Sequence, residues 1–370
     1  MTANAEVVFV ASDRELIDLA ATLRGQPWIV VDTEFLRERT YFPQLCLIQV
    51  AAPGILAGVD ALAIDDWSPM AEIFRSASIT KVFHAARQDV EVLWLKLKAL
   101  PQPIFDTQIV ATLMHGIDQI SYAALVQRVH GITLAKSETR TDWSRRPLLG
   151  KQWEYALDDV RYLAPVYQHQ LQYLSQTGRL AWFDDDFATL NNPATYEPDF
   201  DQAWRRIREA SRLTPRARVA LQALAAWREK TAIARDLPRR WVIDDATLLV
   251  LAQEAPTTTA ALARITGLPG SVRENHGDEL VTCIDESLTR PEQPSLDTDI
   301  YVPLNSNETM IVAKLRETVE AVATREGVPT TVLASRSTLE SVARTGEPRA
   351  YLRGWRSQLL IEPLRLALTR

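Results

Sequence analysis

The chain contains few of the residues from which disulfide frameworks and zinc sites are built. Only two of its 370 residues are cysteines, Cys46 and Cys283, and they lie far apart without the spacing of a metal-binding motif. This argues against a disulfide-stabilised fold and against a zinc centre. Cys46 lies in the apolar run Leu45–Ile48, which indicates a place in the core.

Long apolar runs without charges are also missing. No segment reaches the length of a membrane-spanning helix, and the N-terminus lacks a basic stretch followed by an apolar run. We therefore expect a cytoplasmic protein with no membrane contact. With 46% hydrophobic and 24% charged residues over 370 positions, the composition is typical of a globular chain of two or three domains.

The chain has no overall positive charge, since its formal net charge is −6. The charge is unevenly distributed, however: residues 204–240 contain eleven cations and three acids. Such a stripe is often only the solvated face of a helix, but locally it is also suited to a phosphate-tracking surface.

Two carboxylates follow the first strongly apolar run. Trp28–Val31 predicts a buried strand, and it ends by presenting Asp32 and Glu34. Residues two apart on a strand share a face, so the two carboxylates repel each other and lose hydration. A hard divalent cation between them would relieve that cost.

Two further acidic patches have regular positions. Lys81–His84 predicts a strand that turns into a helix over Val90–Leu97, with Asp89 near the helix start. Residues 152–163 predict a helix on which Tyr155 and Asp159, four apart, face the same way. Asp158, three residues from Tyr155, is the rival for the same role.

Each acidic patch also has an ordinary structural interpretation. An Asp-x-Glu after a strand is usually a solvated strand end, and Asp89 suits a helix N-terminus through the helix dipole. Asp106 is better explained as an N-cap than as a ligand, and His84 as a hydrogen-bonded core residue. The three patches together, in this order, favour a metal site.

Together the patches resemble the three motifs of the tyrosine-type DEDD exonucleases, and among these the ribonuclease D family. The matching residues are Val31–Phe35, His84-Ala85-x-x-x-Asp89 and Tyr155-x-x-x-Asp159, with further likeness at residues 39–45, 106–108 and 136–143. The resemblance covers essentially the whole chain. It implies a 3′–5′ exonuclease in which Asp32, Glu34, Asp89 and Asp159 hold two divalent ions, Mg²⁺ or Mn²⁺.

The resemblance gives Tyr155 the role of orienting the attacking water, because a phenol with a pKa near 10 is a poor base at neutral pH. It favours Asp159 over Asp158 as the third-motif ligand. The cations beside Trp143 in the loop over residues 136–146 suit single-stranded RNA, and a solvated loop is the ordinary alternative. Tyr41 and Phe42 are candidates for stacking on the terminal nucleotides, and a core role for one of them fits the sequence equally well. The candidate RNA-binding residues are Tyr41, Phe42, Lys136, Arg140, Trp143, Arg235, Arg239 and Arg240.

Two helical modules are expected after the nuclease domain, because turn-rich segments interrupt the helical pattern over residues 182–199 and 290–303. The modules repeat at a period of 91 residues: Leu237-Pro238 corresponds to Val328-Pro329. Both resemble the HRDC domain, which implies nucleic-acid binding for at least one. The expected division is 1–185 exonuclease, 186–202 linker, 203–288 first HRDC domain, 289–305 linker and 306–370 second HRDC-like domain.

The predicted fold is an α/β RNase H-like catalytic domain followed by two small all-α HRDC domains. Four strands are expected at residues 28–31, 45–51, 54–64 and 81–84, the first three as an antiparallel meander, with helices near residues 13–23, 69–75, 90–97, 106–115, 121–130 and 151–174.

The predicted function is metal-dependent 3′–5′ exoribonucleolysis that releases nucleoside 5′-monophosphates. The expected substrates are RNAs with a free single-stranded 3′ end, such as tRNA precursors and other small structured RNAs; no obligate protein partner is indicated. A 3′–5′ DNA exonuclease is the first alternative, since the same motifs serve proofreading. An RNA-binding scaffold with a silent site is the second, and the presence of all five motif residues disfavours it.

Overall fold

The computed structural model describes residues 6–117, 119–134, 141–289 and 303–369. These residues form two compact units. The first unit contains the chain up to Leu36, the segment Leu45–Tyr196 and the chain from Leu304 onward. The second unit contains Arg37–Gln44 and Glu197–Pro303. None of the helices in the described residues is long and apolar enough to cross a membrane.

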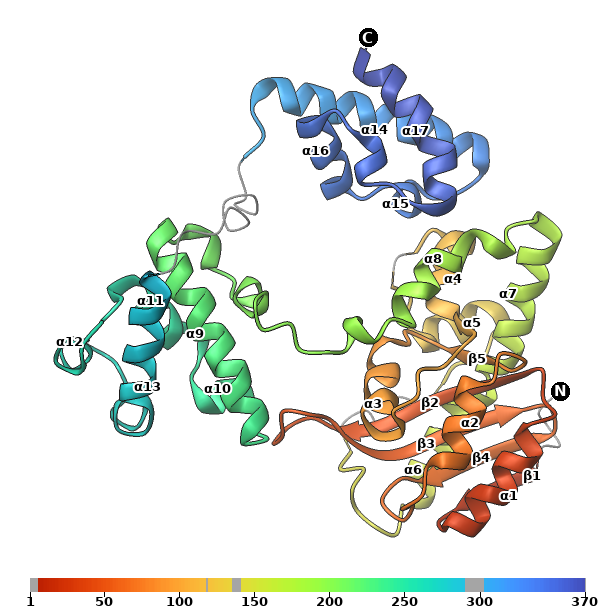
Figure 1. Cartoon of the computed structure of the whole chain (residues 1–370). Helices are drawn as coiled ribbons and strands as arrows, with labels where there is room; N and C mark the ends of the chain where they lie inside the picture. The colour runs from red at the N-terminus through yellow and green to blue at the C-terminus, as the bar shows by residue number, and fades with distance from the viewer. Residues whose placement is uncertain (1–5, 118, 135–140, 290–302, 370) are drawn as a thin grey trace. The chain divides into compact units, whose positions relative to one another are not determined.

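A six-stranded mixed sheet forms the centre of the first unit (Figure 1). Its order is β1-β4-β3-β2-β5-β6. β3 and β4 are antiparallel, whereas the pairs β1/β4, β2/β5 and β5/β6 are parallel. The strands are β1 (Glu6–Val10), β2 (Trp28–Leu36), β3 (Gln44–Ala52), β4 (Ile55–Asp60), β5 (Thr80–Phe83) and β6 (Ile104–Asp106).

Helices cover both faces of this sheet, which explains why the central strands are almost entirely apolar. On β2, Ile29 and Val31 belong to a core with α1, α2 and α3, while Trp28 and Val30 belong to a core with α4, α5, α6 and α7. The helices are α1 (Asp13–Leu23), α2 (Ser68–Arg75), α3 (Arg87–Leu97), α4 (Thr107–His115), α5 (Tyr122–His130), α6 (Gly150–Arg161), α7 (Leu163–Thr177) and α8 (Asp184–Leu190).

Helix α6 crosses β4 at a glycine. A Cβ atom placed on Gly58 would lie 2.3 Å from Cζ3 of Trp153, so the indole occupies the space that any other residue would fill. Trp153 also meets the Phe9 ring edge-on at a centroid distance of 5.3 Å. The absence of a side chain at Gly58 therefore fixes how closely α6 approaches the sheet.

Gly58→Ala is expected to lower the free energy of unfolding by about 1–3 kcal/mol, because the added methyl group overpacks this contact. It should also reduce the RNA hydrolysis that the sequence predicts, since α6 carries the candidate ligand Asp159. Urea denaturation and RNA hydrolysis measure the two effects. Gly25→Ala is the matched control, because a Cβ atom there meets nothing within 4 Å; equal behaviour of the two variants would contradict this account.

Two helical modules follow the sheet domain. The first contains α9 (Pro215–Ala234), α10 (Arg239–Val242), α11 (Asp245–Glu254), α12 (Thr259–Ala263) and α13 (Gly270–Leu288). The second contains α14 (Ser306–Glu326), α15 (Thr330–Leu333), α16 (Arg336–Thr345) and α17 (Gly354–Thr369). Short 3₁₀ helices span Leu180–Phe183, Pro193–Thr195, Ala203–Arg206, Ala210–Arg212 and Pro348–Ala350.

The modules share the repeat that the sequence indicates. The first residues of α9, α10 and α11 lie 91 positions before those of α14, α15 and α16. The capping residues follow the same offset, since Asp244 and Ser335 each accept a hydrogen bond from the third residue of the following helix. The offset is lost at α13 and α17, which begin 84 residues apart.

The second module belongs to the first unit and contacts the end of the sheet domain. The rings of Trp182 and Trp355 stack at a centroid distance of 4.1 Å and an interplanar angle of 10°. Nearby, Arg356 Nη1 lies 2.9 Å from Asp186 Oδ2. The module therefore shares an apolar core with the sheet domain.

Most of the expected elements are present. β2, β3 and β4 are neighbours in the sheet, as a meander requires, and β3 and β4 are antiparallel. Three features differ from the expectation. The sequence pattern does not indicate β1 and β6, because β1 is partly exposed and β6 has only three residues. The single helix expected over residues 151–174 is in fact two helices that meet at Tyr162.

Candidate active site

Three carboxylates meet between β2 and α6. Ligand oxygens of Asp32, Glu34 and Asp159 lie within 4.8 Å of one another. Asp32 and Glu34 alternate with Thr33 on β2 and therefore share one face of the strand. Asp159 comes from the last turn of α6 and is brought to the same face.

Asp89 lies beside this group, in the first turn of α3. Its side chain is buried, and Oδ1 accepts a hydrogen bond of 2.6 Å from Thr33 Oγ1. Its charge contributes to raising the pKa of Asp32, which shows that the two carboxylates are neighbours. We refer to Asp32, Glu34, Asp89 and Asp159 as the acidic site.

Burial raises the pKa of every carboxyl group in the acidic site, and repulsion from other carboxylates of the site raises the pKa values of Asp32, Glu34 and Asp159 further. The pKa of Asp32 is raised well above its usual range, and that of Glu34 to about 9. Burial also raises the pKa values of Asp89 and Asp159 to about 7. One buried and three half-buried carboxyl groups form a donor set of carboxylate oxygens that fits hard divalent cations such as Mg²⁺ or Mn²⁺.

These raised pKa values set the pH dependence of the metal-free protein. Unfolded aspartates lose their protons near pH 4, whereas Asp89 and Asp159 in the folded protein lose theirs near pH 7. The folded state therefore binds more protons between these values, so the free energy of unfolding falls as the pH rises through this window.

We expect a lower melting temperature in EDTA at about pH 8 than at about pH 6, and recovery when Mn²⁺ is added. Thermal denaturation at the two pH values measures this. Asp159→Asn removes one of the titrating groups and should make the decrease in EDTA smaller. A decrease of the same size in this variant would contradict the assignment.

Tyr155 lies one helical turn before Asp159 on α6 and is half-buried. Burial raises the pKa of its phenol above the ordinary value, and the charges of Asp159, Glu34 and Asp32 raise it further. In the metal-free protein the phenol is therefore protonated at neutral pH, so it is a poor base but can donate or accept a hydrogen bond.

The structure places Asp159, and not Asp158, in the acidic site. The Asp158 carboxylate pairs with Arg161. Its backbone carbonyl accepts a hydrogen bond of 2.7 Å from the Tyr122 hydroxyl. The sequence pattern does not identify Tyr122 or Thr33 as residues that support the site, although Thr33 lies between the two ligands of the first patch.

Asp106 is an N-cap, as predicted. Its carboxylate accepts the Gln108 N–H at 2.8 Å at the start of α4, and also the N–H groups of Ala85 and Ala86 at 3.1 and 2.8 Å. Ala85 has a φ of 60°, so these bonds stabilise an unusual turn immediately before α3. Asp106 thereby helps to position Asp89 without belonging to the acidic site.

His84 has the structural role expected of it. Its Nδ1 lies 2.9 Å from Thr107 Oγ1, and its Nε2 lies 3.0 Å from the carbonyl oxygen of Ile120. Both ring nitrogens thus have partners within the protein.

The loop before α6 differs from the expectation. Trp143 is only 4% exposed and packs with Cys46, Leu47 and Ala156, so it is a core residue with little ring surface for a base. The expected base-stacking role of Trp143 does not fit this burial. The other two candidates in this loop, Lys136 and Arg140, lie outside the described residues.

Tyr41 is held inside the second unit. Its hydroxyl donates a hydrogen bond of 2.5 Å to Glu229 Oε2, and Arg239 pairs with the same carboxylate while lying over the Tyr41 ring. The backbone N–H groups of Tyr41 and Phe42 both point to Asp236 Oδ1. Two of the predicted RNA-binding residues, Tyr41 and Arg239, are thus engaged with Glu229.

Tyr41→Phe should lower the free energy of unfolding by about 1–3 kcal/mol, because it removes a hydrogen-bond donor from a buried carboxylate. The Glu229 side chain is only 3% exposed, so water cannot easily replace the phenol. Chemical denaturation of the whole chain measures the effect. Unchanged stability would show that the hydrogen bond does not contribute.

Only some of the cations in residues 204–240 lie on the surface of the protein. Arg218 and Arg228 are 3% exposed, and Arg228 Nη1 lies 2.7 Å from Asp245 Oδ1. Arg235 and Arg240 are exposed. The number of cations available to a nucleic acid is therefore smaller than the sequence count.

Comparison with protein families identifies two segments. Residues 7–174 match the model described as 3′-5′ exonuclease, and residues 217–284 match the HRDC domain. The first segment contains every residue of the acidic site, and the second corresponds to the first helical module.

Similar proteins cover nearly the whole chain. The ribonuclease D of Nitrobacter hamburgensis is 36% identical over 358 residues, which are 95% of this chain and 93% of that protein. The ribonuclease D of Jannaschia sp. is 37% identical, covering 95% and 92%. The crystal structure of Escherichia coli RNase D, described as an exoribonuclease involved in structured RNA processing, superposes with a TM-score of 0.84 at 33% identity, over 99% of both chains.

Proposed function

Because the chain belongs to the ribonuclease D family and is a 3′–5′ exoribonuclease, we propose that its acidic site binds two divalent ions, Mg²⁺ or Mn²⁺. The observation that carries this proposal is the meeting of three carboxylates within 4.8 Å, with the protonated Tyr155 one turn away. When bound, the ions would activate water and stabilise the leaving 3′ oxygen.

The protein's own residues then have separate roles. Asp32, Glu34 and Asp159 provide the oxygen ligands, and Thr33 holds Asp89 in the orientation that completes the set. Tyr155 orients the attacking water by hydrogen bonding and retains its proton. Hydrolysis releases nucleoside 5′-monophosphates from the 3′ end.

The proposed substrates are RNAs with a free single-stranded 3′ end, tRNA precursors and other small structured RNAs among them. The similar E. coli enzyme, an exoribonuclease involved in structured RNA processing, supports this proposal. The exposed Arg235 and Arg240 provide cations for the phosphates of such an RNA. Phe42, Lys136 and Arg140 are further proposed contacts for the RNA. The proposed location of the protein is the cytoplasm.

The second helical module is proposed to be a second HRDC domain. The matching starts of three successive helices, each 91 residues apart, support this. α17 begins only 84 residues after α13, and its Trp355 stacks on Trp182 of the sheet domain. These two features favour a mainly structural role for the second helical module.

The test uses 5′-labelled single strands of RNA and DNA with identical sequence. We expect an RNA ladder that shortens from the 3′ end in Mg²⁺ or Mn²⁺ and stops in EDTA. Faster cleavage of the DNA strand would favour a DNA exonuclease, and no cleavage of either strand would favour a binding scaffold. A tRNA precursor with a 3′ trailer, compared with mature tRNA, tests the substrate class.

A further inference from the structure

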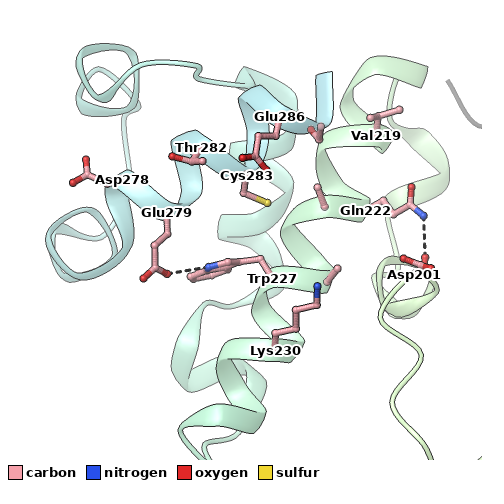
Figure 2. A pocket seen from close by; sticks show the side chains of 13 residues that line it. Asp201, Val219, Gln222, Trp227, Lys230, Asp278, Glu279, Thr282, Cys283 and Glu286 are labelled. Atoms are coloured by element: carbon pink, nitrogen blue, oxygen red, sulfur yellow. Dashed lines mark hydrogen bonds between the residues drawn. The ribbon is translucent and has the colours of Figure 1, made fainter. Parts of the chain in front are cut away.

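A pocket of about 700 Å³ opens between α9 and α13 in the first helical module (Figure 2). It lies within the second unit and contains no residue of the acidic site. α9 provides an apolar side and α13 a polar side.

The apolar side is a strip of α9 that the module's own core leaves partly uncovered. Val219, Ala223, Ala226 and Trp227 follow the spacing of one helical face and are all half-buried. Trp227 is fixed by a hydrogen bond of 3.0 Å from its Nε1 to Glu279 Oε2, drawn in Figure 2. Small alanines beside a fixed indole provide space for apolar side chains of a ligand.

The polar side is acidic. Asp278, Thr282 and Glu286 lie four residues apart along α13, and Asp201 lies across the opening (Figure 2). Four acids line the pocket against one cation, Lys230. Among the ion pairs formed by described residues, none includes Asp278 or Glu286. A nucleic acid would be repelled here, whereas a basic ligand would be attracted.

The geometry points to a docking site for a basic amphipathic helix of a partner protein. Apolar side chains of such a helix would enter along Val219, Ala223 and Ala226, in the manner of helix-in-groove recognition. Its lysines or arginines would face Asp278 and Glu286. The occupant is thus a protein segment, which gives this RNA-processing chain an attachment surface that RNA cannot occupy.

The test uses the full chain and a fluorescein-labelled 16-residue helical peptide of leucine and lysine, with a leucine and glutamate peptide as its counterpart. Anisotropy measures binding. N-ethylmaleimide labelling locates it, because Cys283 lines the pocket while the other cysteine, Cys46, is buried in the sheet domain. We expect the lysine peptide to bind and to protect Cys283.

Paired charge reversals separate docking from general attraction. Glu286→Lys is expected to weaken binding at least tenfold, whereas Asp285→Lys changes the same charge on an exposed residue that does not line the pocket and should change binding little. RNA hydrolysis should be unchanged in both variants. Three results would overturn the proposal. They are an equal loss of peptide binding in the two variants, protection of Cys283 from N-ethylmaleimide by RNA, and its protection by self-association of the protein.

Discussion

Replacing Asp159 with asparagine is expected to lower the rate of RNA hydrolysis by about 10³-fold or more, because metal ions supply several kcal/mol of transition-state stabilisation and about 1.4 kcal/mol corresponds to a factor of ten. Asparagine keeps the size of the side chain but replaces a carboxylate with a neutral amide. Asp159 is one of the three groups whose oxygens lie within 4.8 Å of one another. Initial rates on 5′-labelled RNA in saturating Mn²⁺ measure the loss.

Asp158→Asn is the matched control for this prediction. It removes the same charge one position earlier, but that carboxylate pairs with Arg161. We expect this variant to keep most of the activity. Similar losses in both variants would mean that the general negative charge of α6, and not ligation by Asp159, matters for hydrolysis.

Tyr155→Phe is expected to slow hydrolysis by about 10²-fold, the scale on which a misplaced reacting group affects a rate. The variant removes only the hydroxyl, and burial and the neighbouring carboxylates raise the pKa of this phenol, which makes it a poor base. Affinity for Mn²⁺ should therefore stay the same while kcat falls. Single-turnover hydrolysis and Mn²⁺ titration measure the two quantities.

Tyr351→Phe is the control, since Tyr351 is 40% exposed in the second helical module. Its activity should equal that of the wild type. A Tyr155→Phe enzyme with unchanged turnover, or one whose Mn²⁺ affinity falls together with its rate, would contradict a role limited to positioning water.

The sequence contained enough information to find the acidic residues, because their positions follow local geometry. Asp32 and Glu34 are two apart on a strand, and Tyr155 and Asp159 are four apart on a helix, so each pair faces one way before any tertiary contact is known. Asp158 and Asp159 could be separated only by the resemblance. The structure separates them by the pairing of Asp158 with Arg161.

Long-range packing could not be predicted from the same patterns. Trp143 lies among cations in the sequence, yet its ring is buried against Leu47 and Ala156. Counting cations could not show that Arg228 is buried beside Asp245. The contact of Trp153 with Gly58 joins residues that are far apart in the chain, and the sequence around neither residue predicts this contact.

Titration of the metal-free protein with Mn²⁺, followed by calorimetry and electron paramagnetic resonance, shows directly whether the acidic site binds two metal ions. We expect two Mn²⁺ ions per chain, close enough to couple magnetically, and loss of this coupling in Asp159→Asn. Binding of one ion or none by the wild type, or an unchanged spectrum in the variant, would contradict the proposal.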